Sequence, residues 1–307
     1  MKKFTFGLLS IVLLFSTLSL LGSGKVWIFS LFEHFRHIYF LIALIASLYA
    51  STGLILSKKR IGYLILTVLG VITLSINFSI FRSNNNVTNV GHSNSSQPLK
   101  IFIHNIHRNN NAYQEYQQQL INHFKPDIIA LFEVTPEFIK ETRDLSKNYP
   151  YKIELPSNDN YGFLILSKYE MSDWSIIKDE DIPVTIHLFL PQKKIKIFFV
   201  HLPPPIVPDL WDIQNRTLVK MTSQIKKDHT PVIVAGDFNL TPWSFSLNKF
   251  ANDSGLNIVN ASKINFSATW PSPLSILPID HVFSSIPLEV QIGPTLKSDH
   301  HSLIVYY

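Results

Sequence analysis

The chain has 307 residues, 46% of them hydrophobic, with a formal net charge of +5 at pH 7. It contains no cysteine, which excludes disulfides, thiolate metal sites and cysteine nucleophiles. The charge is uneven: eight basic residues and one acidic residue precede position 99, whereas 19 basic and 21 acidic residues follow it, a net charge of −2. A nearly neutral domain lacks the broad positive field that binding to duplex DNA requires.

Three uncharged apolar runs lie near the amino terminus, at residues 4–22, 38–57 and 61–81. Each is long enough to cross the core of a bilayer as a helix, which takes about 20 residues. The first run is longer than the apolar part of a signal peptide, and no small-x-small cleavage site follows it, which favours an uncleaved helix over a cleaved signal peptide. Residues 1–82 are therefore predicted to form a membrane segment with three transmembrane helices.

Basic residues beside these runs predict the orientation of the membrane segment. Lys and Arg are more frequent on the cytoplasmic side of membrane proteins. Five of them, at positions 2, 3 and 58–60, flank the runs on the side predicted to be cytoplasmic, and Lys25, Arg36 and Arg82 flank them on the other. With three spans, the remainder of this multi-pass protein is predicted on the extracytoplasmic side. Residues 26–35 are apolar but include an acidic residue, so we interpret them as an interfacial stretch. Residues 83–98 have few large apolar side chains and are predicted to be a flexible linker.

Residues 99–307 have the pattern of one globular domain. Short runs rich in Ile, Val and Phe predict buried strands at 99–103, 128–132, 163–166, 186–190, 195–200, 232–235, 281–283 and 303–306. Apolar residues at helical spacing predict helices at 113–124, 136–145 and 216–227. Strands and helices that alternate in this way indicate an α/β domain with helices outside packed sheets.

Polar residues gather at the ends of the predicted strands: Glu133, Asp237, Asp280, Asp299, Asn105, Asn239, His201 and His300. Each alone has an ordinary explanation in a turn or a cap, but the combination does not. If the strand ends converge, several carboxylates share one pocket, and their repulsion raises their pKa values unless a cation neutralises them. An oxygen-rich site of this kind suits Mg²⁺ or Mn²⁺ rather than Zn²⁺. Asp237 and Asn239 are two positions apart and would project to the same side if the strand continued.

Eight segments carry a family likeness, and they span the whole domain: HNIHRNN (104–110), PDIIALFEV (126–134), YGFLILSK (161–168), FFVHLPPP (198–205), VIVAGDFNLTPWS (232–244), TWP (269–271), IDHVFSS (279–285) and SDHHSLIV (298–305). In this order they resemble the endonuclease/exonuclease/phosphatase (DNase I-like) superfamily, with most similarity to its membrane-anchored YafD-like members. The resemblance implies a four-layer α/β sandwich, with two sheets face to face, helices outside, and an active site at one edge of the sheets.

The resemblance also implies roles for individual residues. Glu133 is similar to the family's central metal ligand, with Asn105 and Asp299 beside it, so Mg²⁺ or Mn²⁺ is the implied cofactor. Asp237 is similar to the group that orients or deprotonates the attacking water. Asn239 is similar to the residue that holds a phosphate oxygen. A phosphodiester in this site would be hydrolysed by in-line attack of an activated water.

Two histidines complete the implied catalytic set. His300 would contact the scissile phosphate and be held in orientation by Asp280, in the way that a buried carboxylate orients a catalytic imidazole. His201 would assist the leaving group. Both histidines are expected to be available for proton transfer near neutral pH. The presence of both favours phosphodiester chemistry, although phosphatase branches of the superfamily share most of the set.

The sequence therefore predicts a membrane-anchored, metal-dependent phosphodiesterase, either nuclease-like or phospholipase-like. Its expected partners are a phosphodiester substrate, from a nucleic acid or a phospholipid headgroup, and the lipid bilayer through residues 4–81; no obligate protein partner is inferred. A membrane-tethered binding module that keeps the fold without catalysis is the alternative. A transporter is poorly motivated, because the predicted spans contain no Asp, Glu, Lys or Arg.

Overall fold

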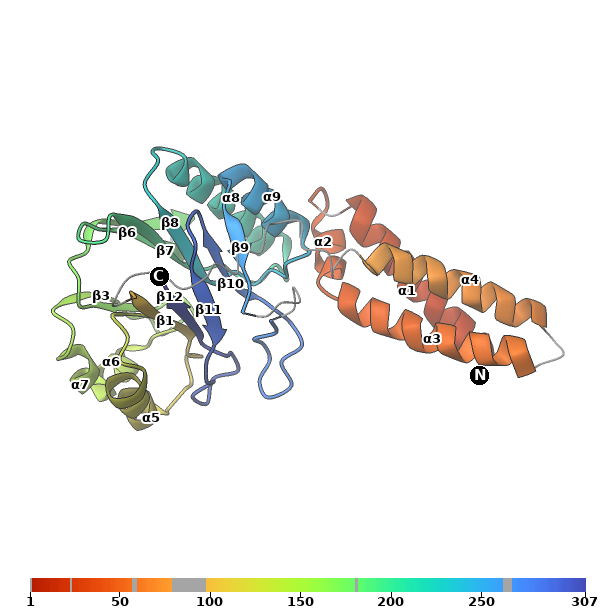
Figure 1. Cartoon of the computed structure of the whole chain (residues 1–307), viewed down its shortest axis with the longest axis horizontal. Helices are drawn as coiled ribbons and strands as arrows, with labels where there is room; N and C mark the ends of the chain where they lie inside the picture. Colours follow the sequence, from red (N-terminus) through yellow and green to blue (C-terminus); the bar gives the residue numbers. More distant parts are fainter. Residues whose placement is uncertain (1, 23, 57–59, 79–97, 180–181, 262–266) are drawn as a thin grey trace.

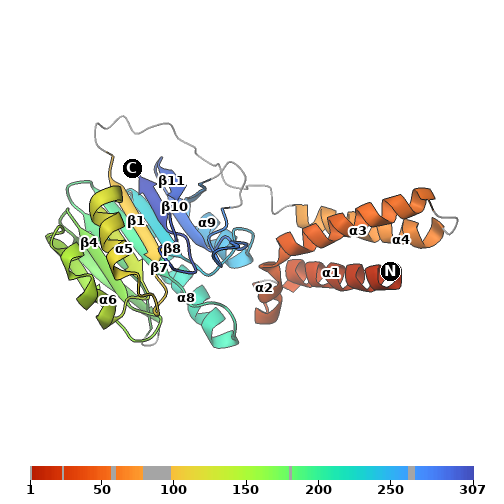
Figure 2. The same ribbon diagram turned by 90° about the horizontal axis from the view of Figure 1, so that it is seen from below.

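The computed structural model describes residues 2–22, 24–56, 60–78, 98–179, 182–261 and 267–307. A β-sandwich flanked by helices lies at one end of the molecule, and a bundle of long helices extends away from it (Figures 1 and 2). Apart from Pro98, the predicted linker lies outside the described residues.

The amino-terminal part forms four helices: α1 (Lys2–Gly22), α2 (Trp27–Glu33), α3 (Arg36–Leu56) and α4 (Arg60–Asn77). Three of them, α1, α3 and α4, are long and apolar enough to span a membrane. Helix α3 begins two residues before the predicted run. Helix α4 ends at Asn77, and residues 79–81 of that run lie outside the described residues. Helix α2 has only seven residues, too short to cross a bilayer.

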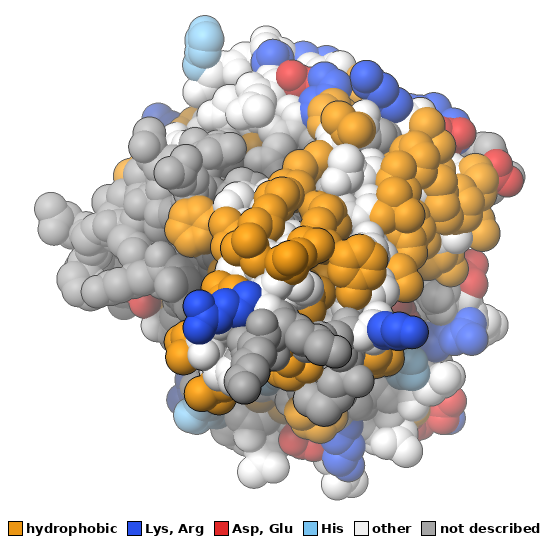
Figure 3. Space-filling model, turned by 90° about the vertical axis from the view of Figure 1, so that its right-hand side faces the viewer, with side chains coloured by type: hydrophobic (Ala, Val, Ile, Leu, Met, Phe, Trp, Pro, Cys, Tyr) orange, Lys and Arg blue, Asp and Glu red, His pale blue; other side chains and the backbone are white. Residues whose placement is uncertain are grey.

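The long helices pack through small side chains and one polar network. A Cβ on Gly70 of α4 would lie 2.0 Å from the Oγ of Ser47 on α3, so the two helices approach closely there. At the end nearer the β-sandwich, Arg36 Nε donates to Asn77 Oδ1 (3.2 Å), and Asn77 Nδ2 donates to Ser16 Oγ (2.9 Å). Viewed from the helical end, hydrophobic side chains fill the centre of the surface and acidic ones appear only toward its periphery (Figure 3).

Two six-stranded mixed sheets form the sandwich. In spatial order the first contains β11 (Glu289–Ile292), β12 (Leu303–Tyr306), β1 (Lys100–Asn105), β2 (Ile128–Phe132), β4 (Phe163–Ser167) and β3 (Tyr151–Leu155). The second contains β5 (Ser172–Asp179), β6 (Ile182–Leu190), β7 (Ile195–His201), β8 (Val232–Asp237), β10 (Asp280–Ser284) and β9 (Asn257–Val259). The pairs β1–β2 and β7–β8 are parallel, and the other pairs are antiparallel.

Successive side chains of a strand point to opposite faces of its sheet, so each strand contributes both to the core between the sheets and to the layer of helices outside. Ile101 and Ile103 of β1 point into the core between the sheets, whereas Phe102 points to the outer face. The outer face of the first sheet is covered by α5 (Tyr113–Gln118), η2 (Gln119–Phe124), α6 (Pro136–Glu141) and α7 (Arg143–Ser146). The second sheet is covered by α8 (Pro208–Ile225) and α9 (Phe245–Ser254). The predicted four-layer α/β sandwich is confirmed.

An ion pair joins the edge strand β5 to α8. The buried Asp179 accepts hydrogen bonds from Arg216 Nη2 (2.7 Å) and Lys220 Nζ (2.8 Å), and the bonds from Arg216 above all lower its pKa. Because this pKa is lower in the folded than in the unfolded state, the pair stabilises the fold above the unfolded pKa of about 3.9. That stabilisation is lost as the pH falls through the folded pKa.

We therefore expect Asp179→Asn to lower the free energy of unfolding near neutral pH by about 1 kcal/mol, a modest value because half of the Arg216 side chain is exposed. The difference should shrink as the pH falls below about 4. Thermal unfolding at both pH values measures it, with Asp144→Asn, in an exposed pair with Lys147, as the control. Equal stability of variant and wild type at neutral pH would contradict this assignment.

Candidate active site

Strand register aligns three of the predicted residues across the second sheet. In the parallel pair β7–β8, His201 lies opposite Asp237, and in the antiparallel pair β8–β10, Asp237 lies opposite Asp280. In the first sheet, Asn105 ends β1 opposite Phe132, so Glu133 directly follows at the same edge. Each side chain therefore stands at the end of a buried strand, where the backbone pairing fixes its position.

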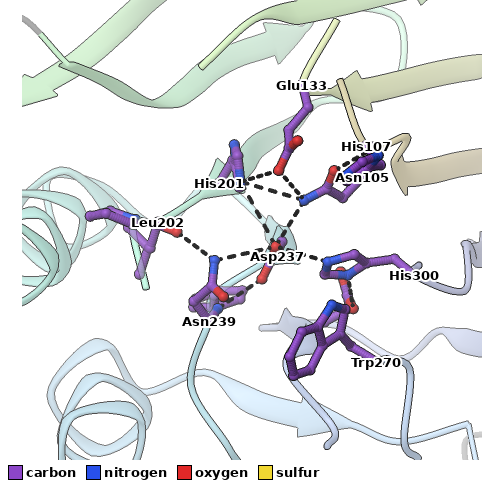
Figure 4. A network of polar contacts seen from close by, with 12 residues as sticks. Asn105, His107, Glu133, His201, Leu202, Asp237, Asn239, Trp270 and His300 are labelled. Carbon is purple, nitrogen blue, oxygen red and sulfur yellow. Dashed lines mark hydrogen bonds and ion pairs between the residues drawn. The ribbon is translucent and has the colours of Figure 1, made fainter. Parts of the chain in front are cut away.

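The two sheets meet at Asn105. Its Nδ2 donates to Glu133 Oε1 of the first sheet and to Asp237 Oδ2 of the second, both at 3.1 Å (Figure 4). His201 Nε2 lies 3.7 Å from Glu133 Oε1 and 3.8 Å from Asp237 Oδ2. Four residues that are far apart in the sequence thus converge on one point between the sheets.

The strand does not continue to Asn239. Strand β8 ends at Asp237, and Asn239 has a left-handed backbone with φ of 51°. This turn nevertheless places Asn239 beside Asp237, because its N–H donates to Asp237 Oδ1 (2.8 Å) and its Nδ2 donates to Leu202 O (2.8 Å). Glu133 is also left-handed, with φ of 60°. Such conformations in residues other than glycine are strained, and they concentrate at functional sites.

His300 links two carboxylates. Its Nδ1 lies 2.9 Å from Asp280 Oδ2, and its Nε2 lies 3.7 Å from Asp237 Oδ2. Burial alone would lower the pKa of His300, but Asp280 and Asp237 outweigh it and raise the pKa to about 10. Burial likewise opposes ionisation of Asp280, and the facing imidazolium more than offsets this and lowers its pKa. His300 is therefore a cation at neutral pH.

The two histidines were both expected to be available for proton transfer near neutral pH, and their pKa values differ from this expectation. Burial lowers the pKa of His201 to about 4, so this ring is neutral at pH 7. Burial, and next the charge of Asp280, raise the pKa of Asp237 above its ordinary value. The two histidines do not share a pKa near neutrality: one is held neutral and the other charged.

Asp299 approaches the site from the loop before β12. Its Oδ2 accepts a hydrogen bond from Trp270 Nε1 (2.9 Å). Seven of the eight predicted site residues line one cavity of about 530 Å³; the eighth, Asp280, stands behind His300. The roles of Trp270 and of three amino-terminal cavity residues, Leu31, His34 and Phe35, were not foreseen from the sequence.

The donor chemistry of the site fits a divalent cation. Glu133 Oε1 and Asp237 Oδ2 converge on the same amide nitrogen of Asn105, and both carboxylates lie in a largely buried setting. A tighter group of possible ligand atoms, from Asp237, Asp280 and His300, lies within 4.8 Å. There His300 is the protonated partner of Asp280, and a protonated imidazole offers a metal ion no lone pair.

Comparison with known proteins places the chain in a family. Residues 89–300, more than half of the chain, match the profile of the Endonuclease/Exonuclease/phosphatase family. The chain belongs to this family. It is accordingly a phosphoric ester hydrolase by class. A search of curated protein sequences found no match.

Solved structures share the fold of the domain. A humanized D. rerio TDP2 is 17% identical, with a TM-score of 0.54 over 68% of this chain and 98% of that one. Beta toxin from Staphylococcus aureus, with bound magnesium ions, is 14% identical, with a TM-score of 0.55 over 68% and 99%. The 3′ phosphatase NExo from Neisseria, bound to a product DNA hairpin, is 14% identical, with a TM-score of 0.54 over 67% and 98%. At these identities the likeness concerns the fold.

Proposed function

We propose that this family member is a membrane-anchored, divalent-metal-dependent phosphodiesterase that hydrolyses its substrate by attack of an activated water. The observation that carries the proposal is the convergence of Glu133, Asn105, Asp237 and the His300–Asp280 pair at one edge of the sandwich. These side chains supply carboxylate ligands, a base and a cationic donor within one cavity, which is the set that hydrolysis of a phosphodiester requires.

The residues would divide the reaction as follows. Asp237, whose pKa is raised by burial, accepts a proton from the attacking water, because a base works best when its pKa approaches the ambient pH. Protonated His300, fixed by Asp280, donates to a non-bridging oxygen and stabilises the charge that develops there. Asn239 holds a second phosphate oxygen, and neutral His201 offers a hydrogen bond near the departing oxygen.

Glu133, Asn105 and Asp299 would hold Mg²⁺ or Mn²⁺. The bound ion would supply charge stabilisation on the phosphate oxygens. Asn105 Oδ1 now accepts the N–H of His107 (3.1 Å), and its Nδ2 bridges the two carboxylates, so ligation through Oδ1 requires rotation of this amide. A magnesium-bound relative of the same fold supports the choice of ion, since beta toxin carries magnesium.

The membrane segment and the orientation belong to the same proposal. Helices α1, α3 and α4 would cross the bilayer, and the uneven distribution of Lys and Arg favours a catalytic domain on the extracytoplasmic side. Anchoring of this kind, together with the membrane-anchored subtype that the sequence resembles, suits a substrate that lies at or arrives at the membrane.

Purified full-length protein in detergent micelles tests the proposal. Hydrolysis of bis(p-nitrophenyl) phosphate, plasmid DNA, RNA and sphingomyelin is measured with Mg²⁺ and with EDTA. We expect turnover with Mg²⁺ and a fall to background with EDTA, because the carboxylate site would lose its cation. His300→Ala should also abolish turnover. A folded protein that binds Mg²⁺ but hydrolyses none of these esters would instead support the non-catalytic binding module.

A further inference from the structure

One wall of the active-site cavity comes from the amino-terminal segment. Leu31, His34 and Phe35 line the same cavity as the catalytic residues, although they precede them by about 70 to 270 positions. Helix α3, one of the candidate membrane spans, begins at Arg36, the residue directly after Phe35. The cavity therefore opens where a helix long enough to cross the bilayer begins, and Figures 1 and 2 show α2 at this junction.

Hydrogen bonds attach this wall to the loops that follow the catalytic strands. Trp27 Nε1 donates to Pro205 O (2.7 Å), in the loop after β7. Trp243 Nε1 donates to Glu33 O (2.7 Å), and the N–H of Phe245 donates to Glu33 Oε2 (3.0 Å), beyond β8. The loops that follow His201 and Asp237 are thus the ones that fix α2. These hydrogen bonds hold the segment in place as one wall of the cavity.

His34 adds a polar group to this wall. Its Nδ1 lies 3.1 Å from Thr241 Oγ1 and accepts the N–H of Thr241 at 3.4 Å. With Nδ1 as an acceptor, the neutral ring carries its proton on Nε2. Burial keeps the ring neutral by lowering its pKa to about 4. The buried Nε2 has no hydrogen-bond partner among the described residues. A buried donor of this kind is expected to meet an acceptor, and an oxygen of a bound ligand would supply one.

The rest of the wall is apolar. Leu31 and Phe35 face the cavity together with Ile206, whose side chain is 59% exposed. Exposed apolar side chains beside a catalytic cavity mark contact with an apolar ligand or a membrane. Arg108 is the one Lys or Arg among the described residues that line the cavity, and residues 99–307 carry a net charge of −2. The backbone of a nucleic acid would meet little positive charge here.

We propose that the substrate is a phosphoester carried by a lipid in the bilayer. Its headgroup enters the cavity past His34, and its apolar chain returns to the bilayer along Leu31, Phe35 and Ile206. This inference rests on the proposed phosphodiesterase function and gives its substrate class. Helix α2 is then part of the substrate-binding site as well as a connection between spans.

Two esters with the same leaving group test the inference on the full-length protein in phosphatidylcholine nanodiscs with Mg²⁺: p-nitrophenyl ethyl phosphate and p-nitrophenyl dodecyl phosphate. We expect kcat/KM to be at least about tenfold higher for the dodecyl ester, because its chain has an apolar path. The double variant Leu31→Ala/Phe35→Ala should lose most of this preference, measured as the ratio of kcat/KM for the two esters. Val26→Ala, on the same segment but outside the cavity, should keep the preference.

Equal kcat/KM for the two esters in the wild type would overturn the inference, and this result does not depend on how the variant folds. A preference that survives Leu31→Ala/Phe35→Ala would overturn it as well, since chain length would then act through the bilayer alone. Faster cleavage of a single-stranded DNA oligonucleotide than of either ester would assign a nucleic-acid substrate instead. In each of these cases the phosphodiesterase function stands. Absence of hydrolysis of both esters would remove that function and the inference with it.

Discussion

Asp237→Asn is expected to lower kcat for bis(p-nitrophenyl) phosphate by about 10³-fold, with a much smaller change in KM. Asparagine has nearly the same shape, and its Oδ1 can still accept the N–H of Asn239, although its Nδ2 cannot accept the hydrogen bond from Asn105. It cannot accept a proton from water, and it removes the negative charge that faces His300 Nε2 at 3.7 Å. The proposed base and the partner of the cationic imidazole are lost in one substitution. Steady-state kinetics with Mg²⁺ measure the effect.

Asp253→Asn is the matched control for this prediction. Asp253 lies in α9, and its carboxylate pairs with Lys249 at the surface. The same change of charge there should leave kcat within about twofold, because exposed pairs contribute little. If Asp237→Asn retained more than about a tenth of the wild-type kcat, another group would have to activate the water, and the assignment of Asp237 as the base would be wrong.

The sequence located the central strands well and missed the edges. Each of the eight predicted apolar runs overlaps an observed strand, and only Leu99 lies outside, one residue before β1. The four strands not predicted, β3, β5, β9 and β11, are the outermost strands of the two sheets. An edge strand pairs on one side only and is partly exposed, so it lacks a continuous apolar run. In β11 only Val290 is buried.

The sequence contains signals for the ends of two helices that apolar spacing alone does not locate. Helix α8 begins eight residues before the predicted start, at Pro208, a residue well suited to the first turn of a helix. Helix α9 was not predicted, although Ser244 caps its first turn through Leu247 N and Gly255 ends it in a left-handed conformation. Both signals are local signals of helix ends, whereas the prediction relied on the spacing of apolar residues along the helix.

The site residues were identified from their positions at strand ends, but their contacts depend on strand order. Asp280 faces Asp237 because β10 inserts between β8 and β9, an order that no local pattern reveals. The bond from Trp270 to Asp299 and the cavity wall of Leu31, His34 and Phe35 are also long-range. The sequence marked residues 26–35 as interfacial, but only the folded chain brings them to the catalytic residues.

Gly236→Ala tests whether the backbone before Asp237 is as constrained as the structure indicates. Gly236 has φ of +143°, and a Cβ added there would lie 2.0 Å from the carbonyl oxygen of Val200 and 3.0 Å from the ring of Phe132. The backbone atom belongs to the neighbouring strand β7 and cannot move without disturbing the register that aligns His201 with Asp237. We expect the free energy of unfolding to fall by about 3 kcal/mol or more.

Thermal unfolding of the full-length protein should show this loss as a fall in Tm of about 10 °C. Gly255→Ala is the matched control, because Gly255 is also left-handed, with φ of +73°, but a Cβ there meets nothing within 4 Å. Its expected destabilisation is only about 1 kcal/mol, the conformational part alone. The difference between the two variants therefore isolates the steric contact between β7 and β8. Equal Tm values for the two alanine variants would show that this contact relaxes, and that the alignment of His201 with Asp237 tolerates movement of the strands.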